Sequence, residues 1–174
     1  MKKLFVLILV VCLLGSAAMA EETVPELNWS DFQEKYENLG SFQQIEIPDS
    51  VTMKYWIPQN MAAFDVSLIQ ADIPPVAAFA TADGEYTAAV SVLDITSLED
   101  YAVSLENNGT GNFRNLILNG FDAIGAENEA DGIDILIIPV TDTQVLVYYF
   151  TPLNGDDGWD STKTVIVASI QVVE

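Results

Sequence analysis

The residues with the clearest potential for chemistry lie in the stretch TPLNGDDGWDSTKT, at positions 151–164. Polar or flexible residues stand at alternate positions in it, namely Asn154, Asp156, Gly158 and Asp160. This spacing resembles the oxygen ligands of an EF-hand calcium loop, but the twelfth position of such a loop supplies a bidentate glutamate, and here it is Val165. Trp159 also stands where that loop requires glycine. The EF-hand interpretation therefore fails, which leaves a looser calcium site or a polar turn before a helix.

A second acidic cluster lies in GAENEADGID, at positions 125–134. Its carboxylates are Glu127, Glu129, Asp131 and Asp134. Alternation along a strand would place the first three on one face at the strand end. That arrangement is compatible with calcium, but the pattern favours a solvated hairpin edge, because charges there also block edge-to-edge pairing.

Other kinds of catalysis find little support in the residue types. The sequence has no histidine and a single cysteine, Cys12, which excludes Ser-His-Asp and Cys-His catalysis in the predicted mature chain and the usual zinc sites. A glycosidase needs two carboxyls about 5–10 Å apart, but with 26 acidic residues almost any pair could be proposed. We therefore predict no enzyme and assign no catalytic, cofactor-binding or metal-binding residue.

Aromatic side chains could form a platform for a sugar or a peptide. The candidates are Trp29, Tyr55, Trp56, Tyr148, Tyr149, Phe150 and Trp159. Aromatic residues in strands more often belong to the core, although at least one member of a consecutive run must face the other side of its sheet. The aromatics are thus a weak indication of binding.

The N-terminus has the layout of a secretory signal peptide. Lys2 and Lys3 precede an uninterrupted apolar run of eleven residues, Leu4–Leu14, and a small-residue cleavage site ends at Ala20. Eleven residues are too few for a membrane-spanning helix, which needs about 20. We predict a signal peptide at 1–20, a single α+β domain at 21–174, and a secreted or extracytoplasmic protein with no stable membrane insertion.

Cys12 lies inside the apolar run and not at the cleavage boundary, so lipid attachment through it is not expected. The mature domain would then contain no cysteine, and therefore no disulfide and no thiolate ligand. A domain of this size can bury enough core to be stable without such bridges.

The chain is strongly acidic, with a formal net charge of −20. Removal of the signal peptide would leave four cations against the 26 acids: Lys35, Lys54, Arg114 and Lys163. Such a surface repels nucleic acid and anionic membranes. It favours solubility and attracts cations or a basic partner.

Hydrophobic periodicity and turn residues predict the elements. A helix is expected from Asn28 to Gly40 with Ser30 as its N-cap, and a short helix followed by a loop within 59–75. A second helix is expected at 97–109 and a final helix from Asp160 or Ser161. Strands are predicted at 41–48, 51–58, 76–83, 86–95, on either side of Asn119-Gly120 within 112–130, at 133–140 with Pro139 at its end or in a bulge, and at 144–153.

This order predicts a largely antiparallel sheet with helices packed on it. Four stretches carry a resemblance to the Mog1/PsbP-like α/β/α sandwich, and within it to secreted proteins of gut Firmicutes: IPDSVTMKYWIPQNM at 47–61, SLEDYAVSL at 97–105, NLILNGFDAI at 115–124 and VIVASIQ at 165–171. The resemblance implies a binding or assembly role.

We therefore expect a secreted, non-enzymatic module without a cofactor, which recognises a protein or peptide and is a monomer or weak oligomer. The alternatives are a calcium-dependent surface protein that uses the acidic turns and, behind it, a hydrolase built on carboxylates.

Overall fold

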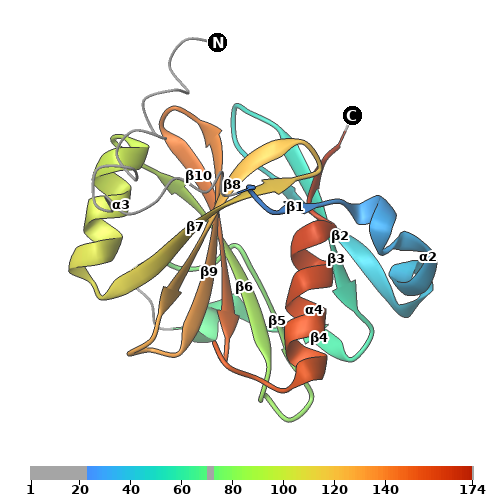
Figure 1. Ribbon diagram of the computed structural model, residues 1–174. Helices are drawn as coiled ribbons and strands as arrows, with labels where there is room; N and C mark the ends of the chain where they lie inside the picture. The colour runs from blue at the N-terminus through green and yellow to red at the C-terminus, as the bar shows by residue number, and fades with distance from the viewer. Residues whose placement is uncertain (1–22, 70–72, 174) are drawn as a thin grey trace.

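The computed structural model describes residues 23–69 and 73–173, so the predicted signal peptide and Cys12 lie outside the described residues. The strands are β1 (Glu26–Leu27), β2 (Gly40–Glu46), β3 (Thr52–Pro58), β4 (Met61–Ala63), β5 (Ala77–Thr81), β6 (Thr87–Asp94), β7 (Thr110–Leu118), β8 (Phe121–Asn128), β9 (Ile133–Thr141), β10 (Gln144–Thr151) and β11 (Gln171–Val172). The α-helices are α2 (Gln33–Tyr36), α3 (Leu98–Asn107) and α4 (Asp157–Ala168), and the 3-10 turns are η1 (Trp29–Asp31), η2 (Glu37–Leu39) and η3 (Val66–Leu68) (Figure 1).

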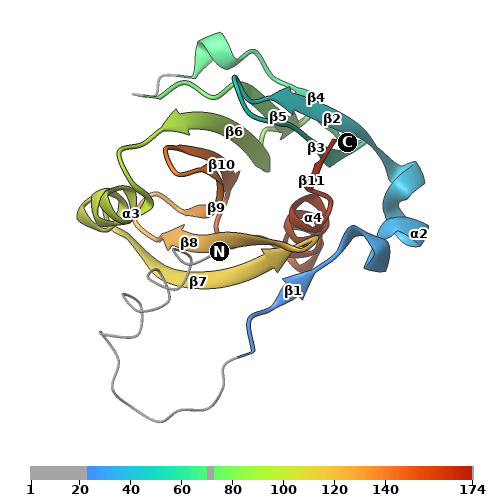
Figure 2. The same cartoon turned by 90° about the horizontal axis from the view of Figure 1, so that it is seen from above.

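The strands form two sheets. The larger has the order β1-β7-β8-β9-β10-β6-β5-β4 and is antiparallel except where β1 meets β7. The smaller sheet has the order β11-β3-β2 and is antiparallel throughout. Figure 2 shows α3 and α4 on opposite sides of the large sheet. The predicted α+β architecture, a largely antiparallel sheet with helices packed on it, is confirmed, although the N-terminal hairpin belongs to a separate small sheet.

Each face of the large sheet contributes to a core. The main core joins the sheet to α4 and to the small sheet, and its fully buried members include Tyr55, Tyr148, Phe150 and Ile166. The second core lies beneath α3 and includes Leu93, Ile135, Val145 and Val147. Strand β10 supplies both cores by alternation, since its odd and even residues face opposite sides. The strand predicted at 144–153, a long apolar run typical of a central strand, is indeed central, because it pairs with both β6 and β9.

Turn chemistry determines most of the strand connections. Gly84 adopts a φ of +73° between β5 and β6, where the Asp-Gly pair predicted a hairpin. Pro139 lies at a shift in the β9–β10 register, where Gln144 faces Thr141 but Val145 faces Pro139. That shift is the predicted bulge. It fits the missing N–H of proline, which cannot contribute to a regular ladder.

The side chain of Asn119 joins three distant parts of the chain. Its backbone has a φ of +47° in the turn between β7 and β8, as the Asn-Gly pair predicted. Its carboxamide oxygen accepts a hydrogen bond from the backbone N–H of Trp29 at 2.9 Å. Its nitrogen donates to the carbonyl oxygens of Ala168, at 2.8 Å, and Ile170, at 2.7 Å. One carboxamide thus ties the N-terminal segment and the end of α4 to the large sheet.

The prediction of one continuous N-terminal helix is wrong. Between Asn28 and Gly40 the chain makes η1, α2 and η2 in succession, and Ser30 lies inside η1 and does not cap a helix. The N–H of Trp29 is bonded to Asn119, a residue 90 positions away. The buried Trp29 ring also lies 6.3 Å from that of Trp56. These tertiary contacts override the local capping pattern.

The region 59–75 also differs from its prediction. It contains the strand β4 and the 3-10 turn η3 where a short helix was expected. Asp65 caps η3, because its side chain accepts a hydrogen bond from the N–H of Ser67 at 3.0 Å.

The final helix exists but begins one turn earlier than predicted. The N-cap of α4 is Asp156, and not Asp160 or Ser161, because its carboxylate accepts the N–H of Trp159 at 2.8 Å. The helix ends at Ala168, and Gln171 and Val172 continue as β11 beside β3. The helical spacing therefore predicted the element, and its bounds depend on which aspartate caps it.

We expect Asn119→Gly to lower the free energy of unfolding by about 2–4 kcal/mol, because glycine keeps the left-handed turn but leaves partly buried backbone groups without their partner. Asn112→Gly is the matched control, since Asn112 also has a positive φ, of 51°, while its exposed side chain bonds only surface carboxylates. The control should lose less than about 1 kcal/mol. Urea unfolding measures both, and equal losses would contradict the role of the Asn119 side chain.

Candidate functional site

The acidic turn before α4 is organised around Trp159. The Trp159 indole nitrogen donates to the carbonyl oxygen of Pro152 at 2.8 Å, and its ring occupies the space where Gly155 would otherwise carry a Cβ. Asp156 caps the helix, and Asp160 forms an ion pair with Lys163 at 3.1 Å. The residues that suggested a calcium loop thus serve as turn, cap and ion-pair partner.

In the second acidic cluster, Arg114 binds two carboxylates. Its guanidinium nitrogens lie 2.9 Å from Glu127 and 3.0 Å from Asp134. The side-chain nitrogen of Asn112 donates to Glu127 at 2.9 Å and to Glu129 at 3.3 Å. Glu127 and Glu129 therefore share a partner, as the predicted strand face requires. Asp131 does not join them, because it accepts from Asn128 in the β8–β9 turn.

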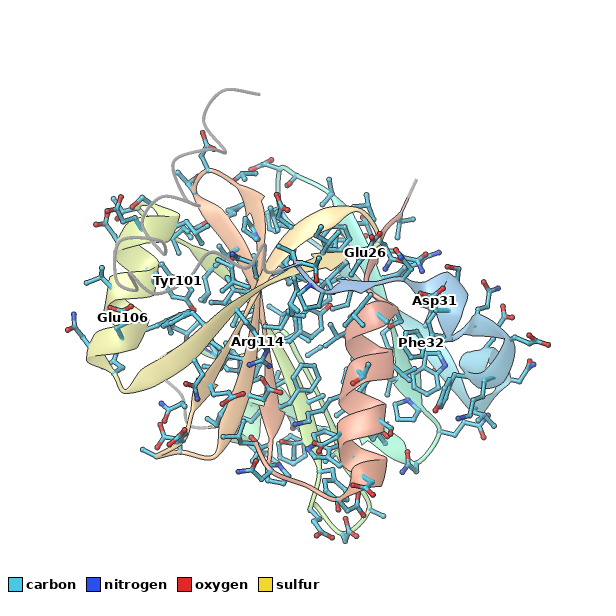
Figure 3. The ribbon with its side chains drawn as sticks, in the orientation of Figure 1. Glu26, Asp31, Phe32, Tyr101, Glu106 and Arg114 are labelled. Atoms are coloured by element: carbon cyan, nitrogen blue, oxygen red, sulfur yellow. The ribbon has the colours of Figure 1, made fainter. Side chains whose placement is uncertain are left out.

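Lys163 connects the two acidic segments. Its ammonium donates to the carbonyl oxygen of Leu153 at 2.8 Å and lies 3.1 Å from Asp160 and 3.4 Å from Asp134. Its side chain is only 11 % exposed, whereas that of Arg114 is 42 % exposed. Figure 3 shows Arg114 on the face of the large sheet that carries α4. We call Arg114, Asp134, Asp160 and Lys163, with Glu127, the ion-pair cluster.

The sequence analysis did not assign a role to Arg114 or Lys163. Their rarity could have indicated a structural role, because they are two of only four cations outside the predicted signal peptide. Within the described residues, no group of three or more acidic side chains is placed to hold a metal ion. The acidic segments instead bind the protein's own cations.

Two hollows lie beside these segments. One, of about 240 Å³, is lined by Tyr86, Asp156 and Trp159, and the Tyr86 ring stacks on that of Trp159 at 4.9 Å. Desolvation, and then the charge of Asp156, raises the pKa of the Tyr86 phenol. The other, of about 460 Å³, is lined by residues that include Glu127, Glu129 and Asn154. The carboxylates at both hollows are already engaged in the internal contacts described above.

The aromatic candidates do not form an exposed platform. Six are buried: Trp29, Tyr55, Trp56, Tyr148, Phe150 and Trp159. Tyr149 faces the opposite side of β10, as alternation predicted, and packs beneath α3. Burial raises the pKa of the Tyr149 phenol, and burial followed by the charge of Tyr149 raises that of Tyr101 on α3. Tyr101 can be located on α3 in Figure 3.

Exposed apolar side chains concentrate in the segment between β4 and β5. Nine large hydrophobic residues are exposed in the described parts of the chain, and four belong to this segment: Phe64 at 45 %, Leu68 at 67 %, Ile73 at 49 % and Val76 at 52 %. We call these four the apolar cluster. The sequence did not reveal it, because a short helix followed by a loop was expected within 59–75, and that prediction assigned these four residues to no common face.

The strand register shows how two members of the apolar cluster come together. The N–H of Phe64 donates to the carbonyl of Ala78 at 2.8 Å, which continues the β4–β5 ladder and places Phe64 opposite Ala78. Val76 is a diagonal neighbour on the same face. Phe79 belongs to the main core, so this face is the opposite one. In Figure 2 the segment lies on the side of β4 and β5 away from α4.

The chain was compared with known proteins. No protein-family model matches it, and no curated protein matches it. Among solved structures it is similar to cyanobacterial PsbP (CyanoP) from Synechocystis sp. PCC 6803, with a TM-score of 0.48 and 10 % identity over 91 % of this chain and 99 % of that one. At this identity the likeness concerns the fold alone. No helix among the described residues is long and apolar enough to cross a membrane.

We expect Lys163→Met to lower the free energy of unfolding by about 1–3 kcal/mol, because Asp134 and the Leu153 carbonyl lose a partner in a largely buried site. The control is Arg114→Met, which removes an exposed cation from the same cluster and should cost less than about 1 kcal/mol. Denaturant unfolding at matched ionic strength distinguishes the two, and a larger loss for the Arg114 variant would contradict this reading.

Calcium at millimolar concentration should leave the melting temperature of the protein unchanged, because Asp156 and Asp160 are already used as cap and ion-pair partner. A bound ion would raise the apparent stability. Differential scanning fluorimetry should also show no calcium response in the Asp156→Asn, Asp160→Asn double variant. An increase in the wild type that disappears in the double variant would restore the calcium-site interpretation.

Proposed function

We propose that this protein is an exported, non-enzymatic binding module that recognises another protein or a peptide through the apolar cluster. The observation that carries the proposal is the concentration of Phe64, Leu68, Ile73 and Val76 in one segment of the surface. Single exposed apolar residues are common, but four in one short segment, two of them neighbours on one face of the sheet, favour an interaction site. Its burial by a partner would contribute roughly 25 cal/mol for each Å² of apolar surface.

The charge of the chain favours a particular kind of partner. A formal net charge of −20 disfavours nucleic acid and anionic lipid and favours a partner with basic residues around its apolar contact. The same charge on every copy opposes close self-association, which supports a monomer or weak oligomer.

The contacts of the acidic residues support a binding role over a catalytic one. Glu127 and Asp134 are paired with Arg114, and Asp160 is paired with Lys163, so these carboxylates stabilise the fold. Export is proposed from the N-terminal sequence, whose charged, apolar and small-residue regions follow the order of a secretory signal.

The experiment uses the tagged protein as bait for the envelope and medium of the producing organism, with chemical crosslinking and quantitative mass spectrometry. The double variant Phe64→Ser, Leu68→Ser should recover the partner at least about tenfold less than the wild type, because two apolar anchors are lost. A purified partner should show a similar loss of affinity by calorimetry.

The matched control is Val24→Ser with Val103→Ser, which also replaces two exposed apolar residues, but outside the apolar cluster. This control should bind as the wild type does. A partner recovered equally by both double variants, or no saturable enrichment of any partner by the wild type, would contradict the proposal.

A further inference from the structure

The described strands include four that end a sheet, and they differ in length. Strands β1 and β4 at the edges of the large sheet have two and three residues, and β11 at one edge of the small sheet has two. The fourth edge is β2, which has seven residues, Gly40–Glu46. Very short edge strands are a common protection against pairing with another chain, and β2 lacks it.

The hydrogen-bond pattern shows which backbone groups of β2 point outward. The N–H of Ile47 donates to the carbonyl of Val51, and the N–H of Gln59 donates to the carbonyl of Leu39. In an antiparallel pair the bonded positions alternate, so the odd residues of β2 face β3. The N–H and C=O groups of Phe42, Gln44 and Glu46 therefore point away from the sheet. Within the described part of the chain no hydrogen-bond partner is found for them.

The opposite edge of the small sheet is closed by the protein itself. β11 pairs with β3 at Met53 and Lys54. Further along the same edge, the N–H of Trp56 donates to the hydroxyl oxygen of Ser169 at 2.7 Å. The small sheet is thus capped on one side and open along β2 on the other.

β2 also lacks several other devices that usually protect an edge. Its sequence, GSFQQIE, contains no proline and no lysine. Its register with β3 runs without a bulge from Gly40 opposite Pro58 to Glu46 opposite Thr52. A regular, extended and exposed edge of this kind can accept an additional strand.

Two side chains beside the open edge define the chemistry of that strand. Phe42 is 38 % exposed, and its ring packs against Trp29 at 5.3 Å and beneath the ammonium of Lys54 at 5.4 Å. Glu46 lies on the same face, four residues along the strand, and is exposed. A strand added here would place an apolar side chain beside Phe42 and a basic one beside Glu46.

We propose that β2 binds an extended segment of another protein, which joins the small sheet as an edge strand and carries an apolar and a basic side chain in the spacing of Phe42 and Glu46. The outward backbone groups supply affinity, and the two side chains supply selection. This inference goes beyond the binding role of the apolar cluster and uses a different surface, so either can fail without the other.

A basic segment fits this edge better than a second copy of the chain does. Each copy carries a formal net charge of −20, so pairing of two β2 edges would bring like-charged surfaces together. The segments before and after β2 add the exposed acids Glu37 and Asp49 near its ends. Together with Glu46 these acids outnumber Lys54, which pairs with Gln44 in the register, so a cationic strand would relieve the local charge.

The test uses the isotope-labelled protein and a short, blocked, threonine-rich peptide with one leucine and one lysine in the required spacing, at millimolar concentration. Amide hydrogen exchange is read by NMR. In the free protein the amides of Phe42 and Gln44 should exchange rapidly while those of Gln43 and Ile45 are protected. The peptide should slow exchange at Phe42 and Gln44 at least about tenfold, since their N–H groups gain acceptors.

Gln44→Pro tests the backbone contribution most directly, because it removes one outward N–H and leaves the hydrogen bonds between β2 and β3 in place. It should abolish the effect of the peptide while Ile45 stays protected. Should that variant unfold the hairpin, Glu46→Lys tests the proposal independently. It should reverse the preference between the lysine peptide and a control peptide with glutamate at the same position.

The other outcomes overturn the inference. Unchanged exchange at Phe42 and Gln44 with the lysine peptide excludes strand addition at this edge. Protection that increases with protein concentration in the absence of peptide assigns the edge to a second copy. Equal binding of the lysine and glutamate peptides removes the charge selection.

Discussion

The arrangement of this protein depends most directly on the carboxamide of Asn119. It accepts the N–H of Trp29 and donates to two carbonyls at the end of α4, so three segments far apart in the sequence meet at one side chain. The residue that carries this carboxamide lies in the left-handed turn between β7 and β8. Because the end of α4 is held there, Ser169 reaches the N–H of Trp56 and β11 reaches β3. The hydrogen bonds of Asn119 to the end of α4 therefore help to position the small sheet and, with it, the open edge of β2.

The N-terminal end of α4 is held by the Asp156 cap and by the Trp159 indole, which donates to Pro152, and ion pairs hold the middle of the helix. Lys163 binds the Leu153 carbonyl and two aspartates, and Arg114 continues the ion pairs onto the large sheet. Between the two ends the helix buries Val165 and Ile166 against the main core. A helix anchored in this way at both ends gives the fold little freedom near the acidic segments. This is why those segments serve stability, and why the exposed features with no internal partner lie elsewhere, on β2 and on the segment after β4.

The sequence predicts what short-range chemistry decides. Asp83-Gly84 and Asn119-Gly120 give their turns, because the preferred backbone angles belong to the residues themselves. The helix expected at 97–109 forms as α3, and of its two candidate caps, Thr96 and Ser97, the structure uses Ser97. The prediction of Ser30 as a helix N-cap was wrong, because the neighbouring N–H of Trp29 bonds to Asn119, 90 residues away. Near the start of α4, four residues could cap the helix: Asp156, Asp157, Asp160 and Ser161. Asp156 is the cap in the structure, where the Trp159 side chain is fixed by its hydrogen bond to Pro152. The division into two sheets and the ion-pair cluster depend on contacts between distant strands, which periodicity does not encode.

The four cations outside the predicted signal peptide explain the character of the surface. Arg114 and Lys163 are held in ion pairs, while Lys35 lies 4.8 Å from the ring of Tyr36 and Lys54 lies over that of Phe42. Every one of them is committed to an internal contact, whereas many of the 26 acids face solvent. The resulting field is anionic and speeds the encounter with a basic partner, although the charge itself supplies little of the final affinity. Affinity must then come from groups that still lack partners, namely the apolar cluster and the outward backbone of β2. Charge thus favours encounters with basic partners, whereas apolar contact and strand pairing determine which of these partners bind tightly.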